Sequence, residues 1–146
     1  MEKLTSTKAA EMLGVNVETL RYYERIGLAP VPAKTSGGHR IYSAEDIATL
    51  FFIRRARMLG FSLDEIRSLL SMASAPDRLA VRNIAQERLN KLSAELEEKR
   101  IAAEILKTAI GECESNSGGC QIMDMLKNPN FPKGIIAATE NKKSAS

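Results

Sequence analysis

The sequence predicts a mainly α-helical fold in three parts: a winged helix-turn-helix head, a long helix and a short cysteine loop. Two short helical patterns separated by a glycine turn, followed by a basic Ser-Gly-Gly hairpin, predict the head. Apolar residues recurring every 3.5 positions predict the long helix. We expect these parts to span residues 1–75, 76–112 and 113–127, with a flexible tail over 128–146.

The first two helices are marked by capping residues and by glycine. Ser6 or Thr7 is expected to be the N-cap of the first helix and Gly14 to end it, because the left-handed conformation at a helix end favours glycine. Asn16 is expected to cap a second helix that ends at Gly27. In a helix-turn-helix the second helix is the one that enters the DNA groove.

A basic hairpin is expected next. The segment PVPAKTSGGHRIY places a Ser-Gly-Gly turn before β-prone residues, which predicts a small wing; a surface loop that is basic by chance is the alternative. His39, the sole histidine, has no carboxylate or histidine neighbours in sequence. We therefore expect it to contact phosphate or to pack, not to catalyse or ligate.

Two further helices begin with capping boxes. Ser43 with Asp46, and Ser62 with Glu65, follow the pattern in which a hydroxyl and an acid three residues later cap each other's backbone. The third helix is expected to end at Gly60. The residues expected to face the core are Ile47, Leu50, Phe51, Arg54, Met58 and Leu59 in the third helix, and Leu63, Ile66, Leu69 and Leu70 in the fourth.

Positive charge is concentrated in the head. Residues 1–60 hold nine Lys and Arg against six Asp and Glu, so their excess of three equals the net charge of the whole chain. Such an excess favours a partner with a phosphate backbone, and arginine interleaved with tyrosine suits phosphate contact and groove insertion. The residues expected to contact DNA are Asn16, Thr19, Arg21, Tyr22, Lys34, His39, Arg40, Tyr42, Arg54 and Arg57.

The long helix is expected from about Asp77 to Glu112. Of the heptad positions 85, 89, 92, 96, 99, 103, 106, 110 and 113, all but Lys99 are apolar, which is the pattern of a coiled-coil seam. A helix about 54 Å long cannot be covered by a sixty-residue head. A second copy of the chain is the natural partner, so we expect a homodimer.

The two cysteines, Cys113 and Cys120, enclose the polar loop ESNSGG. Two thiolates without histidine favour Cu(I), Ag(I) or Hg(II), or Cd(II), Pb(II) or Zn(II) with further ligands from water or a partner subunit. Met123 is a nearby soft donor, although methionine on an apolar helix face is more often core. A reversible disulfide that acts as a redox switch, or two incidental surface thiols, are the alternatives.

Several classes of protein are disfavoured. No apolar run approaches the ~20 residues that span a bilayer, and the N-terminus lacks the apolar segment of a signal peptide, so we expect a cytoplasmic protein. The sequence holds no His/Cys/Asp constellation and no phosphate-binding loop, which argues against an enzyme.

The runs TLRYYERIGLAP and GGHRIYSAEDIATLFFIRRARMLGFSLDEIRSLL resemble the head of MerR-type (mercury-resistance) transcriptional regulators. The resemblance is dense over residues 4–72, and the two-cysteine loop resembles the metal-responsive branch. It implies a homodimer, joined by an antiparallel coiled coil, that bends and untwists promoter DNA for RNA polymerase when effector binds the loop. It would place Arg21 and Tyr22 on the recognition helix and the residues Lys34, His39, Arg40 and Tyr42 in the wing, with Arg54 and Arg57 supporting the wing.

One position departs from that family pattern. Divalent-metal members carry a third cysteine at the start of the long helix, where this chain has Arg78. This favours Cu(I), Ag(I) or Hg(II) over Cd(II), Pb(II) or Zn(II), and a cation there would offset the charge of two thiolates. A metal-responsive regulator is therefore the leading hypothesis, and a thiol-based redox or electrophile sensor of the same fold is the alternative.

Overall fold

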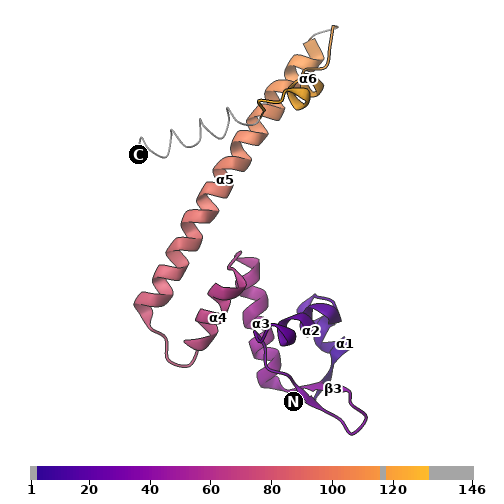
Figure 1. The fold of residues 1–146 in the computed structure, drawn as a ribbon, viewed down its shortest axis with the longest axis vertical. Coiled ribbons are helices and arrows are strands. Elements are labelled where there is room, and N and C mark those ends of the chain that lie inside the picture. The colour runs from indigo at the N-terminus through magenta and orange to yellow at the C-terminus, as the bar shows by residue number, and fades with distance from the viewer. Residues whose placement is uncertain (1–2, 116–117, 132–146) are drawn as a thin grey trace. The chain divides into compact units, whose positions relative to one another are not determined.

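The computed structural model describes residues 3–115 and 118–131 (Figure 1). The chain divides into two compact units, Met1–Arg88 and Leu89–Ser146. Most of the tail expected over 128–146 lies outside the described residues. Within them, in chain order, the elements are β1 (Leu4–Thr5), α1 (Ser6–Leu13), α2 (Val17–Arg25), β2 (Ala33–Lys34), β3 (Arg40–Tyr42), α3 (Ala44–Met58), α4 (Leu63–Ser71), α5 (Arg78–Ser115) and α6 (Gln121–Lys127).

The helix-turn-helix is formed by α1 and α2. Thr5, and not Ser6 or Thr7, caps α1: its hydroxyl accepts a hydrogen bond from a first-turn backbone N–H at 3.4 Å. Asn16 caps α2 as predicted, because its side-chain oxygen accepts from the backbone N–H of Thr19 at 2.8 Å. The capping residues therefore fix where both helices begin.

The predicted wing is the hairpin of β2 and β3, in which Lys34 pairs with Arg40. Gly38, in the turn, has φ +80°, a conformation that favours glycine. The strand β1, which the sequence analysis did not predict, pairs with the other edge of β3 and places Leu4 opposite Tyr42. A two-residue strand is too short to show the alternation by which strands are predicted.

Both predicted capping boxes are confirmed. At the start of α3 the Ser43 hydroxyl accepts from the Asp46 N–H at 3.1 Å, and the Asp46 carboxylate accepts from the Ser43 N–H at 2.8 Å. Ser62 and Glu65 make the same reciprocal bonds at the start of α4. These local signals define helix starts without any help from tertiary structure.

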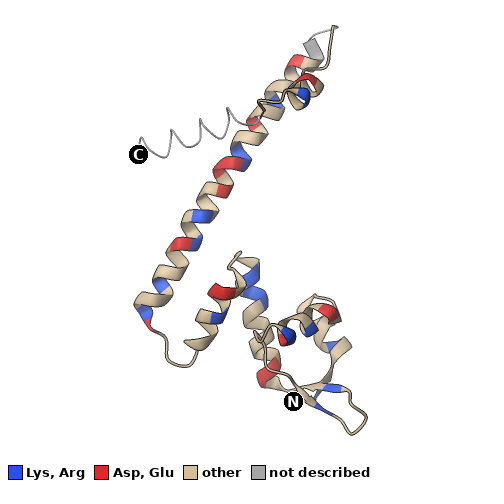
Figure 2. Cartoon of the chain, in the orientation of Figure 1, with Lys and Arg blue, Asp and Glu red and all other residues tan. Residues whose placement is uncertain are grey.

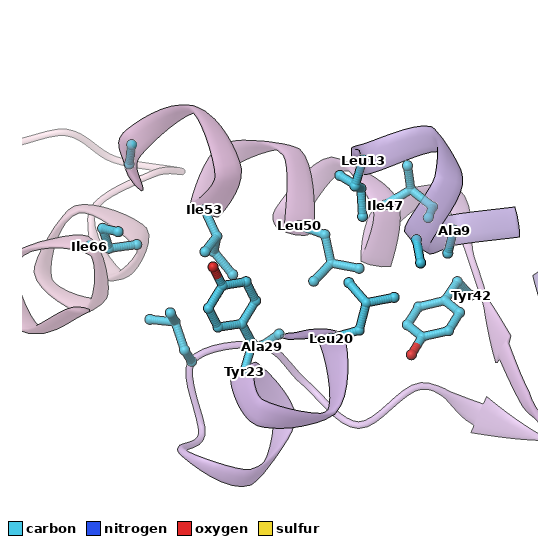
Figure 3. Packing of buried hydrophobic residues seen from close by; sticks show 13 residues of the cluster. Ala9, Leu13, Leu20, Tyr23, Ala29, Tyr42, Ile47, Leu50, Ile53 and Ile66 are labelled. Carbon is cyan, nitrogen blue, oxygen red and sulfur yellow. The ribbon is translucent and has the colours of Figure 1, made fainter. Parts of the chain in front are cut away.

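The core of the head lies between α3 and the other helices, and the predicted core face of α3 is partly wrong. Its buried residues are Ile47, Leu50, Ile53 and Ala56. Ala56 lies nine residues after Ile47, and at about 100° per residue this places the two side chains about 180° apart around the helix axis. The buried face therefore winds halfway around α3. Figure 3 shows why: the Ile47 end lies near Leu13, Ala9 and Tyr42, and the Ile53 end lies near Tyr23 and Ile66.

Met58 and Leu59 were predicted to face the core but are 70% and 62% exposed. They lie at the C-terminal end of α3, past the last buried residue of the helix, Ala56. In α4, Ile66 is fully buried as predicted. The hydrophobic cluster of the head is therefore centred on the middle of α3 and not on its end.

The long helix is present as α5. It has 38 residues, about 57 Å of helix, and the side-chain oxygen of Asp77 accepts from two backbone N–H groups of its first turn at 3.1 Å. The seam residues of α5 are exposed in the single chain, as shown by Leu89, Leu92, Leu96, Leu106 and Ile110. The short predicted helix after Cys120 is α6. None of the described helices combines the length and the apolar character that crossing a bilayer requires.

Candidate nucleic-acid interface and thiol site

Two hollows flank α2, the second helix of the helix-turn-helix. The first, of about 470 Å³, lies between the N-terminal end of α1, the start of α2 and the hairpin. It brings together Arg21, His39 and Arg40, three of the residues predicted to contact DNA. Figure 2 shows Lys and Arg on α2, the hairpin and α3. A hollow with several cationic side chains beside a helix N-terminus favours an anionic partner such as phosphate.

The second hollow, of about 430 Å³, lies on the other side of α2. Asn16, Thr19, Tyr22 and Arg57 line it together. Tyr22 is partly exposed, and the Arg25 guanidinium lies 5.6 Å from the centre of its ring. Residues from α2 and from the C-terminal end of α3 therefore form one surface, although they are far apart in sequence.

Arg21 is available for an external partner. Its guanidinium pairs with the Glu18 carboxylate at 3.3 Å, and both side chains are largely exposed. Such surface pairs contribute little, because water and salt screen them. Arg21 can therefore exchange Glu18 for a phosphate or a base edge at small cost. Lys34 is likewise exposed, on β2.

The wing is held to α2 by a buried carboxylate. Glu24 accepts a hydrogen bond from Arg40 Nε at 2.9 Å and from the Tyr42 hydroxyl at 3.0 Å. Tyr42 is only 2% exposed, and burial, followed by the hydrogen bond to Glu24, raises the pKa of Tyr42 above its usual value near 10. Tyr42 was predicted to contact DNA; its burial instead makes it an anchor for the wing, and we leave it out of the proposed contact surface.

Glu24 was not among the site residues predicted from the sequence, although its position matches the apolar spacing of α2. Its signal was an acid four positions after Leu20, on the apolar face of a short helix. A carboxylate at such a position has to be paired if the face is buried. The pattern could therefore have identified Glu24 as buried, but its partners on β3 follow only from the fold.

Arg54 and Arg57 support the head through backbone carbonyls. Arg54 Nε donates to the Leu13 carbonyl at 3.1 Å, at the C-terminal end of α1, and Arg57 donates to the Phe61 carbonyl at 3.0 Å. Arg54 is half-buried, whereas Arg57 is exposed. Only Arg57 also lines one of the two hollows beside α2.

The two thiols come together at the C-terminal end of α5. Cys113 Sγ and Cys120 Sγ lie 3.5 Å apart, and neither cysteine is in a disulfide. The backbone N–H of Met123, and then the Cys113 thiol, lower the pKa of the Cys120 thiol. A lowered pKa favours the thiolate, which is both the nucleophile and the metal ligand.

Two thiols are a small donor set. Among residues 3–115 and 118–131 no group of three or more His, Cys, Asp or Glu side chains is placed to hold a metal ion. At their present separation of 3.5 Å, the two sulfurs can bind one metal ion through two bonds of about 2.3 Å with a bent S–metal–S angle. A linear S–metal–S arrangement requires the sulfurs to move about 1 Å farther apart. Both arrangements suit a thiophilic ion, whereas a closed four-coordinate site needs donors other than these two thiols.

Comparison with known proteins agrees with this architecture. Residues 4–73 match the family model described as "MerR HTH family regulatory protein", and residues 47–108 match the model described as "MerR, DNA binding". The mercuric resistance operon regulatory protein of Serratia marcescens is 32% identical over 139 residues, which cover 94% of this chain and 96% of that protein.

Solved structures show the same likeness. A MerR family transcriptional regulator from Bacillus cereus matches with a TM-score of 0.71 and 25% identity over 81% of this chain and 87% of its own. The transcription regulator PbrR691 from Ralstonia metallidurans CH34, in complex with lead(II), matches with a TM-score of 0.65 and 29% identity, over 84% of this chain and 98% of its own. The resemblance noted in the sequence is thereby confirmed, and the chain belongs to the MerR family of DNA-binding transcriptional regulators.

Proposed function

We propose that this regulator binds promoter DNA as a homodimer and changes transcription when a soft metal ion binds Cys113 and Cys120. The observation that carries the proposal is the pair of free thiols, 3.5 Å apart, at the end of a helix whose apolar seam is exposed. Members of this family are transcriptional regulators and not enzymes.

DNA contact is proposed through α2 and the hairpin. Arg21, His39 and Arg40 share one hollow beside α2, and Asn16, Thr19, Tyr22 and Arg57 share the other. Lys34 extends this surface along β2. These side chains would contact phosphates and base edges, with the cations supplying most of the salt-sensitive affinity.

The homodimer is proposed through α5 as an antiparallel coiled coil. Leu96 is 70% exposed in the single chain, and its seam neighbours Leu89, Leu92 and Leu106 are about half exposed. Full burial of an exposed leucine contributes about 1.5–3 kcal/mol, so burying the exposed half of each of these side chains contributes roughly 1 kcal/mol, and a seam of this length favours association with a second copy. The dimer would present two heads to one promoter.

The metal proposal is supported by the relatives as well as by the thiols. The Serratia marcescens relative is named for mercuric resistance, and the PbrR691 structure contains lead(II). In this chain Cys113 and Cys120 would hold the ion, which would cross-link α5 to the start of α6. Arg78 in place of a third cysteine favours Cu(I), Ag(I) or Hg(II) over Cd(II), Pb(II) and Zn(II).

The switch itself is proposed to be DNA distortion. Effector binding at the two thiols would bias the dimer toward a form that bends and untwists the promoter. Promoter elements spaced too far apart would then align for RNA polymerase. The ligand can shift this equilibrium only by its preference for one of the two forms.

Redox or electrophile sensing is the second candidate function. The short distance between the sulfurs and the lowered pKa of Cys120 suit disulfide formation equally well. In that reaction the two thiols lose two protons, and an external oxidant takes two electrons. The resulting disulfide would lock the same link between α5 and α6 that a metal ion would make.

Anaerobic metal titration separates these candidates. The reduced protein is titrated with Cu(I), Hg(II), Cd(II) and Zn(II), beside Cys113→Ser, Cys120→Ser and the matched thioether control Met123→Leu. We expect binding at one metal per chain that is lost in both serine variants and kept in Met123→Leu. Binding no tighter than that of a free dithiol would refute the metal proposal and favour the redox switch.

A further inference from the structure

Three helices of the head end in the same way. A glycine with positive φ follows each of α1, α2 and α3, namely Gly14, Gly27 and Gly60. The last carbonyls of a helix lack intrahelical donors and carry the negative end of the helix dipole. In each case an arginine from a later helix donates to carbonyls at or just past the helix end: Arg54 to Leu13, Arg67 to Ile26 and Gly27, and Arg88 to Leu59.

Arg67, on α4, contacts the recognition helix with two hydrogen bonds. Its Nη2 donates to the Ile26 carbonyl at 2.9 Å and its Nη1 to the Gly27 carbonyl at 3.2 Å. The planar fork of a guanidinium can hold two acceptors in a fixed direction, which a lysine ammonium does less well. Arg67 therefore fixes the direction of the C-terminal end of α2 as well as neutralising it.

The position of Arg67 separates it from the proposed DNA contacts. It lines neither of the hollows beside α2, although Leu63 of the same helix lines one of them. Its partners lie after the last residue of α2, whereas Asn16 and Thr19 lie at the opposite end of that helix. A change at Arg67 would reach the DNA-facing residues only through the orientation of α2.

We propose that Arg67 is a positioning residue that sets the angle of α2 and thereby the discrimination between promoter and other DNA. A rotation that moves base-contacting side chains by about 1 Å weakens hydrogen bonds whose optimum is narrow. Phosphate contacts by long arginine and lysine side chains tolerate such a shift. The inference rests on DNA binding by α2 and is independent of the metal, so failure of the metal proposal leaves it unaffected.

The test compares specific with non-specific binding. The wild-type dimer is used to select a duplex from a random-sequence pool, and a scrambled duplex of the same length serves as the non-specific probe. Affinities of wild type, Arg67→Met and Arg67→Lys are measured over a range of salt concentrations, well below each melting temperature. Arg57→Met is the matched control, because Arg57 is exposed and lines a hollow beside α2.

We expect Arg67→Met to weaken binding to the selected duplex about ten-fold or more. Its affinity for the scrambled duplex, and the slope of log affinity against log salt concentration, should not change. Arg67→Lys, which can still donate to one carbonyl, is expected to restore part of the loss. Arg57→Met should weaken both duplexes and reduce the magnitude of the salt slope by about 0.9 for each phosphate that the variant no longer neutralises.

Two results would overturn the proposal. A salt slope that falls in Arg67→Met as it does in Arg57→Met would make Arg67 a phosphate contact. Unchanged affinity for the selected duplex, with only a lower melting temperature, would make it a purely structural cap. If Arg67→Met does not fold, the ratio of the affinities for the selected and scrambled duplexes is compared between Arg67→Lys and wild type. An unchanged ratio refutes the proposal.

Discussion

Replacing Glu24 by leucine should destabilise the head through the loss of two hydrogen bonds to a buried carboxylate. Among the residues that the structure describes, Glu24 is the one buried charged side chain, at 9% exposure. Leucine removes both acceptor oxygens, so the buried Tyr42 hydroxyl loses its carboxylate partner and is left with the Ser6 hydroxyl beside it. Arg40 loses its carboxylate as well, but its side chain is 27% exposed and can reach water.

The magnitude follows from these two losses. A hydrogen bond to a charged group contributes about 1.5–3 kcal/mol, and the variant loses two such bonds. Part of this loss is offset by burial of the leucine, which leaves a destabilisation of about 3 kcal/mol. For a domain of 60–100 residues, 1 kcal/mol shifts the melting temperature by about 4–8 °C, so the head should melt at least about 12 °C lower.

A double-mutant cycle tests the reasoning. Tyr42→Phe alone removes one hydrogen bond to the carboxylate and leaves Glu24 paired with Arg40, which should cost about 1.5–3 kcal/mol. In the Glu24→Leu background the same change removes a hydroxyl whose remaining neighbour is the uncharged Ser6, and should cost less than about 1 kcal/mol. The coupling free energy between the two sites is therefore expected to reach about 1–2 kcal/mol.

The assay can observe the head alone. The chain contains no tryptophan, and its three tyrosines all lie in the head, so tyrosine fluorescence during urea unfolding reports on that unit. Glu18→Leu is the matched control, because this glutamate also lies on α2 but is exposed and forms its ion pair with Arg21 at the surface. We expect the control to change stability by less than about 0.5 kcal/mol. Additive effects of Glu24→Leu and Tyr42→Phe would contradict the network.

Three further predictions concern pH, backbone and assembly. Because the pKa of Tyr42 is raised on folding, its contribution to the free energy of unfolding is present below pH ~10 and is lost as the pH rises through the pKa of the folded state. The urea concentration at the midpoint of unfolding should therefore fall between about pH 8 and 11, and should fall less in Tyr42→Phe. Gly60→Ala should lower the melting temperature, because φ is +83° and a Cβ there meets the Arg88 guanidinium at 2.5 Å, whereas Gly111→Ala, in open space on α5, should stabilise by up to about 1 kcal/mol. Leu96→Glu should convert the dimer to monomers in analytical ultracentrifugation, and an unchanged dimer would place the interface elsewhere.

The parts of the fold that local chemistry determines could be predicted from the sequence. The Asn16 cap and the two capping boxes are written in four-residue patterns, and the hairpin follows from its turn residues. The core face of α3 could not be predicted, because its buried side turns as the helix passes from one set of partners to another. Met58 and Leu59 match the helical period but lie past the last buried turn.

The candidate sites divide in the same way. The spacing of Cys113 and Cys120 indicated that their sulfurs can meet, since few residues separate them. The pairing of Glu24 with Arg40 and Tyr42 spans 16 and 18 residues, and that of Arg67 with the end of α2 spans about 40. Nothing in the local sequence specifies such partners, so Tyr42 was assigned to a surface that its burial excludes.

The carboxylate clamp between α2 and β3 has a consequence for how the chain can diverge. Because Glu24 accepts hydrogen bonds from both Arg40 and Tyr42, we expect the hairpin and α2 to move as one piece. The separation between the places where they would meet a duplex would then be constant. Substitutions on the exposed side of α2 can change which bases are preferred while the length of the footprint stays the same. A lineage of such proteins could acquire new operators of unaltered size through changes on that one exposed face.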